Sequence, residues 1–305
     1  MKNLRFALNL PAVAFLTLTF ASVASALPLR TWVSSAGMDG NPCSRSSPCA
    51  TFQGAHDKTA AGGEINCVDA ADYGTVLINK ALTIDCAGTL ASIFVPMGSF
   101  GITVAAGSND VVTLRNLSLD GGGTSNFGIV YNAAAAVHLE NIRVFSFSVD
   151  CVHMGLAATS VLLTVDDSTI SDCGGAGLLL NNGGGTAAVN INNTRISKTA
   201  EGINAINGTR ITITNSTIFF NNYGVFQFAG GGSTVTAIGN TFGYSAVAAL
   251  QSSGNGPDFI LAFGNNFVND VLVFNPNGGQ IYTGGDNNNS GSTAGTANGG
   301  TLPKI

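Results

Sequence analysis

The chain has 305 residues, of which 45% are hydrophobic and only 10% are charged, and its formal net charge is −5. The apolar share excludes a disordered chain, and the charged share is well below the roughly 25% usual in soluble domains. Neutralising nucleic-acid phosphates needs clusters of Lys and Arg, so we expect no nucleic-acid partner for this acidic chain. The 40 glycines, with abundant Asn, Ser and Thr, are typical of short strands joined by uncharged polar turns.

Residues 1–26 have the features of a secretory signal peptide. Lys2 and Arg5 precede an apolar run over residues 8–21, and Ala24-Ser-Ala26 is a small-residue cleavage site. The alternative is a membrane anchor, but the run is shorter than the roughly 20 apolar residues that a spanning helix needs. We expect a mature chain that begins near Leu27, has no transmembrane segment, and is secreted, periplasmic or held at the cell surface.

All six cysteines follow this segment, in a chain bound for a compartment where disulfides persist. Cys43 and Cys49 bracket a short loop, and their spacing favours this pair most. A Cys67–Cys86 bond would join neighbouring turns of a repeat, and a Cys151–Cys173 bond remains by elimination, although other connectivities are open. The absence of a Cys-x-x-Cys motif argues against zinc.

A four-residue phrase recurs every 22 to 26 residues, and such a period predicts a repeat architecture. It reads Asn116-Leu-Ser-Leu119, Asn141-Ile-Arg-Val144, Asp167-Ser-Thr-Ile170, Asn193-Thr-Arg-Ile196 and Asn215-Ser-Thr-Ile218, then loosens to Gly239-Asn-Thr-Phe242 and Gly264-Asn-Asn-Phe267. A second column, mostly Gly, repeats in step: Gly128, Cys151, Gly177, Gly202 and Gly224. The residues before each phrase alternate between apolar and polar, which indicates half-buried strands rather than helices.

Short strands at this period can wind into a parallel coil, with each turn pairing with the next at about 4.8 Å. Asn116, Asn141, Asp167, Asn193 and Asn215 would then stack as a ladder of side-chain amides, with Asp167 accepting from both neighbours. The alternative is that these residues form turns or glycosylation sequons. The regular spacing favours the ladder, and a buried amide predicts that Asn193→Ala destabilises by roughly 1 to 3 kcal/mol.

The chain resembles the right-handed parallel β-helix proteins of the pectin-lyase-like superfamily. The Asn column carries the likeness, together with Asp39-Gly-Asn-Pro-Cys43, Pro48-Cys-Ala-Thr-Phe52 and Asp72-Tyr-Gly74 in the N-terminal segment. The resemblance implies an all-β solenoid over residues 65–283, behind an N-terminal cap at 27–64 with a short helix at 51–60. Such a cap would protect the open edge of the first coil. The Gly-, Asn-, Ser- and Thr-rich residues 284–305 are expected to be a frayed tail or linker.

One outward face of this coil is the candidate catalytic site. The alternation places Arg115, His138, Glu140 and Asp166 on three adjacent turns, with Glu140 directly beside Asp166. Two carboxylates so close recruit a cation, typically calcium, and Arg115 would neutralise an acidic sugar or act as the base of an elimination. The alternative is a solvated ion pair of Arg115 with Glu140, worth well under about 1 kcal/mol.

Four further residues are candidate substrate contacts. Arg143 and Arg195 share a column two turns apart and would add basic character, while Asp150 and His153 lie near the Gly column. A lone His in such a column is more often structural. Exposed aromatic rings would favour glycan binding, although Phe at coil corners is usually part of the core; the candidates are Phe145, Phe147, Phe219, Phe220 and Tyr223.

The sequence lacks motifs that catalytic members of the superfamily carry, and this absence determines the function that we expect. The chain has no Gly-His-Gly, and Arg195-Ile-Ser-Lys198 is one residue too long for the Arg-x-Lys of polygalacturonase-like sites. A pectate-lyase-like calcium site would need a third acid beside Glu140 and Asp166. We therefore predict a β-helix that contacts extracellular polysaccharide without a demonstrable catalytic site. The alternatives are a polysaccharide lyase or glycoside hydrolase acting on an acidic glycan, and an adhesin-like or structural spacer.

Overall fold

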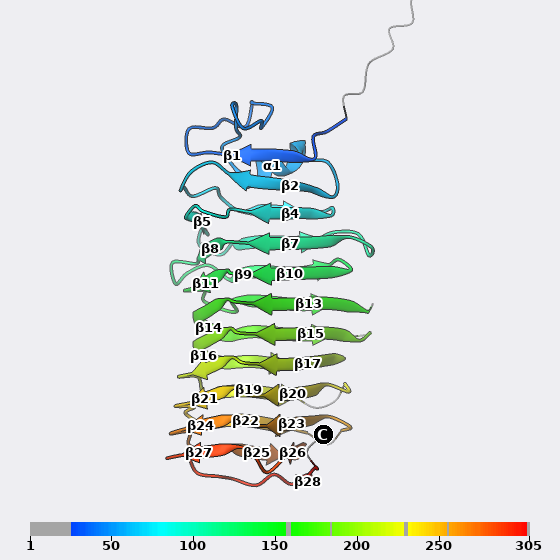
Figure 1. The fold of residues 1–305 in the computed structure, drawn as a ribbon, viewed down its shortest axis with the longest axis vertical. Helices are drawn as coiled ribbons and strands as arrows, with labels where there is room; N and C mark the ends of the chain where they lie inside the picture. Colours follow the sequence, from blue (N-terminus) through cyan, green and yellow to red (C-terminus); the bar gives the residue numbers. More distant parts are fainter. Residues whose placement is uncertain (1–25, 157–159, 184, 229–230, 255, 304–305) are drawn as a thin grey trace, which may run out of the picture.

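The computed structural model describes residues 26–156, 160–183, 185–228, 231–254 and 256–303. The chain winds into a parallel β-helix whose coils stack along one long axis, from β1 to β28 (Figure 1). All but the last residue of the expected signal peptide lies outside the described residues. In the part of the chain that the structure describes, no helix is long and apolar enough to cross a membrane.

The first face of the β-helix is a parallel sheet with one strand from each coil. Its strands are β1 (Arg30–Val33), β2 (Gly63–Cys67), β4 (Leu82–Asp85), β7 (Val111–Arg115), β10 (Ala136–Glu140), β13 (Val161–Asp166), β15 (Ala187–Asn192), β17 (Thr209–Thr214), β20 (Thr234–Ile238), β23 (Phe259–Phe263), β26 (Gln280–Thr283) and β28 (Gly300–Thr301). The alternation predicted for these strands is confirmed, because Val137, Leu139, Val189 and Ile191 have no exposed surface. Like residues therefore stack on like residues along the core.

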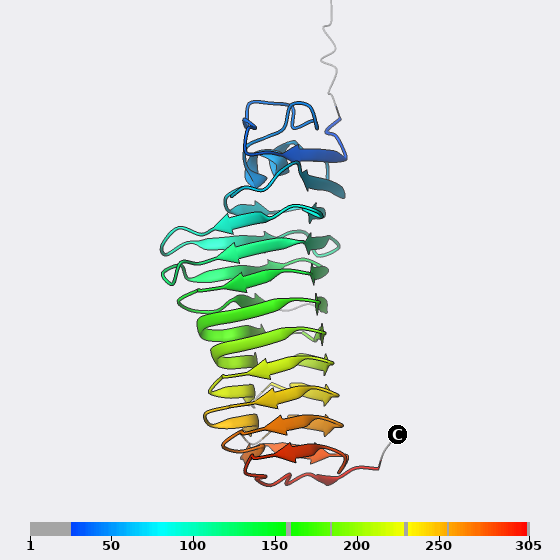
Figure 2. The same cartoon turned by 60° about the vertical axis from the view of Figure 1, so that its left-hand side comes forward.

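The second face consists of strands or strand segments of three or four residues, and most strands of the third face are longer. Figure 2 shows the stacked coils turned so that another side comes forward. The second contains β5 (Ala91–Phe94), β8 (Leu117–Asp120), β11 (Arg143–Phe145), the start of β14 (Thr169–Asn182), the start of β16 (Arg195–Ala205), β18 (Thr217–Phe219), β21 (Thr241–Gly243), β24 (Asn266–Val268) and β27 (Asn288–Ser290). The third contains β3 (Val76–Ile78), β6 (Phe100–Ala105), β9 (Phe127–Ala133), β12 (Val152–Leu156), the ends of β14 and β16, β19 (Tyr223–Phe228), β22 (Ala248–Ser253) and β25 (Phe274–Asn277).

Two columns of residues with positive φ make the corners on either side of the second face. The first-corner column has φ between 47° and 65° and comprises Asn116, Asn141, Asp167, Asn193, Asn215, Gly239 and Gly264. The second-corner column follows five positions later, with φ between 53° and 61°, and comprises Ser146, Asp172, Lys198, Phe220, Tyr244 and Asn269. Asn, Asp and Gly adopt this left-handed conformation most easily, which accounts for the recurring first residue of the sequence phrase.

The buried amide ladder predicted for the first-corner column is wrong in its position. Asn141 donates to Asn116 over 2.6 Å and Asn193 to Asp167 over 2.6 Å, but these side chains lie at the surface. The buried polar column is one residue further on and comprises Ser168, Thr194, Ser216, Asn240 and Asn265, each at most 3% exposed. A left-handed residue turns its own side chain outward, so the next residue is the one that reaches into the corner.

Both ends of the β-helix are built from local sequence. At the N-terminus, α1 (Phe52–Lys58) begins after Thr51, whose Oγ1 accepts from the Gly54 amide over 2.9 Å, and it buries Phe52 and Ala55. At the C-terminus, the expectation of a frayed tail is wrong for the stretch containing β27 and β28. The half-buried Asn287 continues the polar column, because its Oδ1 accepts from the Asn265 amide over 2.8 Å.

The structure contains disulfides between all three expected cysteine pairs. They join Cys43 to Cys49, Cys67 to Cys86 and Cys151 to Cys173, with Cα–Cα separations of 4.7, 4.8 and 5.7 Å. The second bond connects the end of β2 to the residue after β4, so it joins neighbouring coils of the first face.

Candidate functional site

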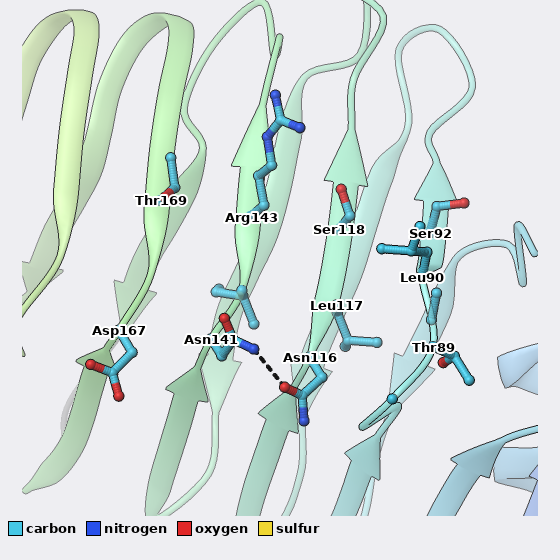
Figure 3. A pocket seen from close by; sticks show the side chains of 13 residues that line it. Thr89, Leu90, Ser92, Asn116, Leu117, Ser118, Asn141, Arg143, Asp167 and Thr169 are labelled. Carbon is cyan, nitrogen blue, oxygen red and sulfur yellow. Dashed lines mark hydrogen bonds between the residues drawn. The ribbon is translucent and has the colours of Figure 1, made fainter. Parts of the chain in front are cut away.

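A groove of about 690 Å³ with mixed polar and apolar lining runs along the axis on the second face, across the coils of β5, β8, β11 and β14 (Figure 3). Its lining residues are Gly88, Thr89, Leu90, Ala91, Ser92, Asn116, Leu117, Ser118, Asn141, Ile142, Arg143, Asp167 and Thr169. The buried Leu117 and Ile142 form its floor, whereas Leu90 and Arg143 are exposed. The first-corner side chains, which sequence reasoning assigned to the interior, thus become one edge of a solvent-facing groove.

Arg143 is the basic group of this groove. Its guanidinium carbon lies 4.2 Å from the centre of the Phe145 ring, two residues along the same outward face. Such a cation–π contact restrains the long side chain and leaves its donors free for an anion. The parallel register aligns Arg143 with Thr169, and Thr169 with Arg195. Two exposed arginines therefore lie in one column about 10 Å apart, two strand spacings along the axis.

The four predicted catalytic residues lie on the outer side of the first face, and none of them lines the groove. The expected register is confirmed, since Arg115, Glu140 and Asp166 are aligned on β7, β10 and β13. Arg115 Nε lies 2.8 Å from Glu140 Oε2, with both side chains about half exposed, and His138 Nδ1 lies 2.9 Å from Thr164 Oγ1. This geometry matches a cross-strand ion pair on an open sheet. Among the described residues, no group of three or more His, Cys, Asp or Glu side chains is placed to hold a metal ion.

Asp150 and His153 form a second polar cluster, on the third face. Asp150 is 3% exposed and accepts from the Ala176 amide over 2.7 Å, while its other oxygen lies 2.8 Å from His153 Nδ1. His153 also packs on Phe127, with ring centres 4.5 Å apart. Burial raises the pKa of Glu201, and the negative charge of Asp150 adds to this shift.

The raised pKa of Glu201 predicts a pH dependence of folding. A carboxyl group whose folded pKa exceeds its unfolded value favours the folded state while it is protonated. This stabilisation is complete below the unfolded pKa and is lost as the pH rises through the folded pKa. We expect Glu201→Gln to remove this loss, so that its Tm exceeds the wild-type Tm near neutral pH and the two converge in acid. Thermal melts of both proteins across this range test it, and parallel curves would contradict it.

The position of the groove and the exposure of the aromatic side chains are the features that the sequence predicts least well. The predicted Arg143 is in the groove and Arg195 extends its column, whereas Asp150 and His153 lie on another face. Phe147 is 1% exposed, as expected for a core residue, but Phe220 is 52% exposed. Asn and Asp at a regular spacing are also typical of left-handed corners, whose side chains point outward. This interpretation of the first-corner column predicts that its side chains lie at the surface, beside the groove.

Residues 64–218 match the protein family described as "Right handed beta helix region". Among solved structures, pectate lyase Pel9A is 12% identical with a TM-score of 0.62, covering 90% of this chain and 78% of the lyase. A rhamnogalacturonan lyase is 10% identical with a TM-score of 0.40, covering 83% of this chain and 84% of that one. The A-module of the Azotobacter vinelandii mannuronan C-5 epimerase AlgE6 is 13% identical with a TM-score of 0.35, covering 80% and 94%.

No curated protein sequence matches the chain. The likeness to pectate lyase Pel9A extends over most of both chains and shows a common fold. The family match spans half of the sequence, from β2 to β18, and includes every coil that lines the groove. The stacked parallel coils and this match together show that the chain belongs to the right-handed parallel β-helix family.

Proposed function

We propose that this protein is exported and binds an acidic extracellular polysaccharide along the groove of its second face, without cleaving it there. The observation that carries the proposal is the column of Arg143, Thr169 and Arg195 at the groove and just beyond it. Guanidinium groups bind carboxylates through paired hydrogen bonds, so two arginines two coils apart suit a polymer that carries more than one acidic group.

The remaining groove chemistry suits the hydroxyl groups of a sugar chain. Asn116, Asn141, Ser118 and Thr169 offer uncharged donors and acceptors along the axis. Because successive coils are about 4.8 Å apart, a linear ligand parallel to the axis meets a new set of polar side chains at each coil, and the Asp167 carboxylate is one of the acceptors. The likeness to pectate lyase Pel9A concerns the fold alone, and the name of that enzyme makes pectate the first acidic polysaccharide to test.

Removal of both arginines is expected to weaken polysaccharide binding selectively. We expect the double variant R143A/R195A to lose about tenfold or more in affinity for polygalacturonate or alginate, since two charge-assisted contacts disappear. Isothermal titration or affinity electrophoresis measures this, with and without calcium.

Arg210→Ala is the matched control, because Arg210 is an exposed arginine on the first face, away from the groove. An equal loss of binding free energy per removed charge in this control and in the double variant would show that only net charge matters and would contradict the groove. Failure of the wild-type protein to retain any polysaccharide would favour a structural spacer instead.

A second candidate, a polysaccharide lyase or glycoside hydrolase, is favoured by the direct pairing of Glu140 with Asp166 in the sheet register. Calcium would be held by these two carboxylates, with Arg115 beside them. Incubation with the same polysaccharides in calcium, scored for new chain ends, separates the two candidates. Cleavage that E140Q or D166N abolishes would establish the enzyme and place its site on the first face.

A further inference from the structure

Two bulky aromatic residues occupy the second-corner column in a conformation that such residues rarely adopt. Phe220 has φ 59° and Tyr244 has φ 56°, and they lie next to each other on successive coils. Phe220 is 52% exposed and Tyr244 is 46% exposed, so neither ring is held in place by burial in the core. A backbone strain retained at exposed positions, where Asn or Gly would be easier, indicates that the side chains themselves have a use.

The Phe220 and Tyr244 rings form a stacked pair, and the Phe219 ring beside them is tilted by 48° to Phe220 and by 61° to Tyr244. The rings of Phe220 and Tyr244 are stacked, with centres 4.9 Å apart and planes 19° apart, and Phe219 lies 6.1 Å from each. Gly243 makes room for this arrangement, since a Cβ there would lie 2.0 Å from Phe219 Cε1. We call Phe219, Phe220 and Tyr244 the aromatic corner.

The size and surroundings of the aromatic corner suit a sugar ring better than a protein partner. Two half-exposed rings, each of roughly 150–250 Å² in full, are far smaller than the roughly 800 Å² per partner of a stable protein interface. On the preceding coils the same column contains Lys198 and Asp172, whose Nζ and Oδ1 atoms are 3.4 Å apart. A small apolar face rimmed by charged and polar groups matches a sugar ring, which has an apolar C–H face and a polar edge.

The aromatic corner lies on the two coils that follow Arg195, three residues along each coil from the arginine column, which continues there as Thr217 and Thr241. The groove reaches Thr169, Arg195 follows on the next coil, and the Phe220 and Tyr244 coils come directly after it. Only the three-residue strands of the second face separate the two corner columns. A chain that leaves the groove along the axis therefore arrives beside the aromatic corner.

We propose that the aromatic corner is a second subsite, which binds the apolar face of a pyranose ring of the polysaccharide, with Lys198 beside it. This inference rests on the proposed function for the identity of the polymer. It differs from that function in its chemistry, because stacking contributes affinity that does not depend on the charge of the sugar.

The test replaces each ring by a residue that suits the corner. Phe220→Asn and Tyr244→Asn keep a side chain that tolerates positive φ, as Asn269 does in the same column, so folding is preserved. We expect each variant to bind polysaccharide several-fold to about tenfold more weakly, with an unchanged salt dependence. R143A/R195A should instead flatten the salt dependence. Phe228→Asn is the matched control, since Phe228 is 54% exposed on the third face.

The outcomes separate the two sites. Unchanged affinity of both Asn variants, with a loss in R143A/R195A, would overturn the aromatic corner and leave the groove standing. The reverse pattern would keep the aromatic corner and overturn the groove. If sedimentation shows a wild-type dimer that Phe220→Asn dissociates, the aromatic corner is a contact between copies of the chain and the subsite is wrong. No polysaccharide binding by the wild-type protein overturns both.

Discussion

Replacing Asn265 by Ala is expected to destabilise the protein by about 3 kcal/mol, because two buried backbone groups lose their partners. Asn265 has no exposed surface. Its Oδ1 accepts from the Asn240 amide over 3.0 Å, and its Nδ2 donates to the Ala237 carbonyl over 2.8 Å. Both backbone groups belong to the preceding coil, at a corner where the sheet ladder is interrupted, and water cannot reach them.

Two further variants make this result specific. Asn265→Ser should lose only part of the stability, because Ser216 in the same column accepts from the Thr194 amide through its hydroxyl over 3.1 Å. Asn193→Gly should stay within about 0.5 kcal/mol of wild type, since this exposed residue sits at φ 47°. Urea denaturation measures all three. If Asn193→Gly lost as much free energy of unfolding as Asn265→Ala, the first-corner column would be the stabilising one.

The contrast between these two positions shows how far the sequence could predict this fold. The period and the alternation were sufficient to place Val137 and Leu139 inside and His138 outside, because strand geometry allows no other arrangement. The phrase beginning at Asn193 gave the corner its correct place in the coil. The prediction that its Asn lies in the interior is wrong, because buried stacked amides and exposed left-handed corners favour the same residue types at the same spacing.

The candidate site was predictable only where it depended on strand register. Arg143 and Arg195 could be aligned in one column from the repeat, and the structure aligns them through Thr169. The groove beside Arg143 depends on the shape of the turns that precede β5, where the sequence phrase is absent. The exposure of Phe220 depends on its backbone angle, and a Phe gives no sequence signal for positive φ.

A methyl group added to the Gly column is expected to cost about 2 kcal/mol, within the range for overpacking a tight core. A Cβ on Gly177 would lie 2.6 Å from the Gly202 carbonyl oxygen and 2.8 Å from Ile196 Cγ2. The carbonyl belongs to the backbone of the next coil, and Ile196 is fully buried, so neither can move aside without opening the stack. We therefore expect Gly177→Ala to lower the Tm by several degrees and Gly177→Val to lower it further.

The matched control for this substitution is Gly40→Ala in the N-terminal cap, where a Cβ has nothing within 4 Å. This variant should melt with the wild-type protein, because it adds a methyl group to open space. Differential scanning calorimetry compares the three proteins directly. The recurring Gly would then reflect the distance between coils, since the next turn passes too close to Gly177 for a Cβ there. A Gly177→Ala variant as stable as wild type would mean that the coils can separate locally, and the Gly column would need another explanation.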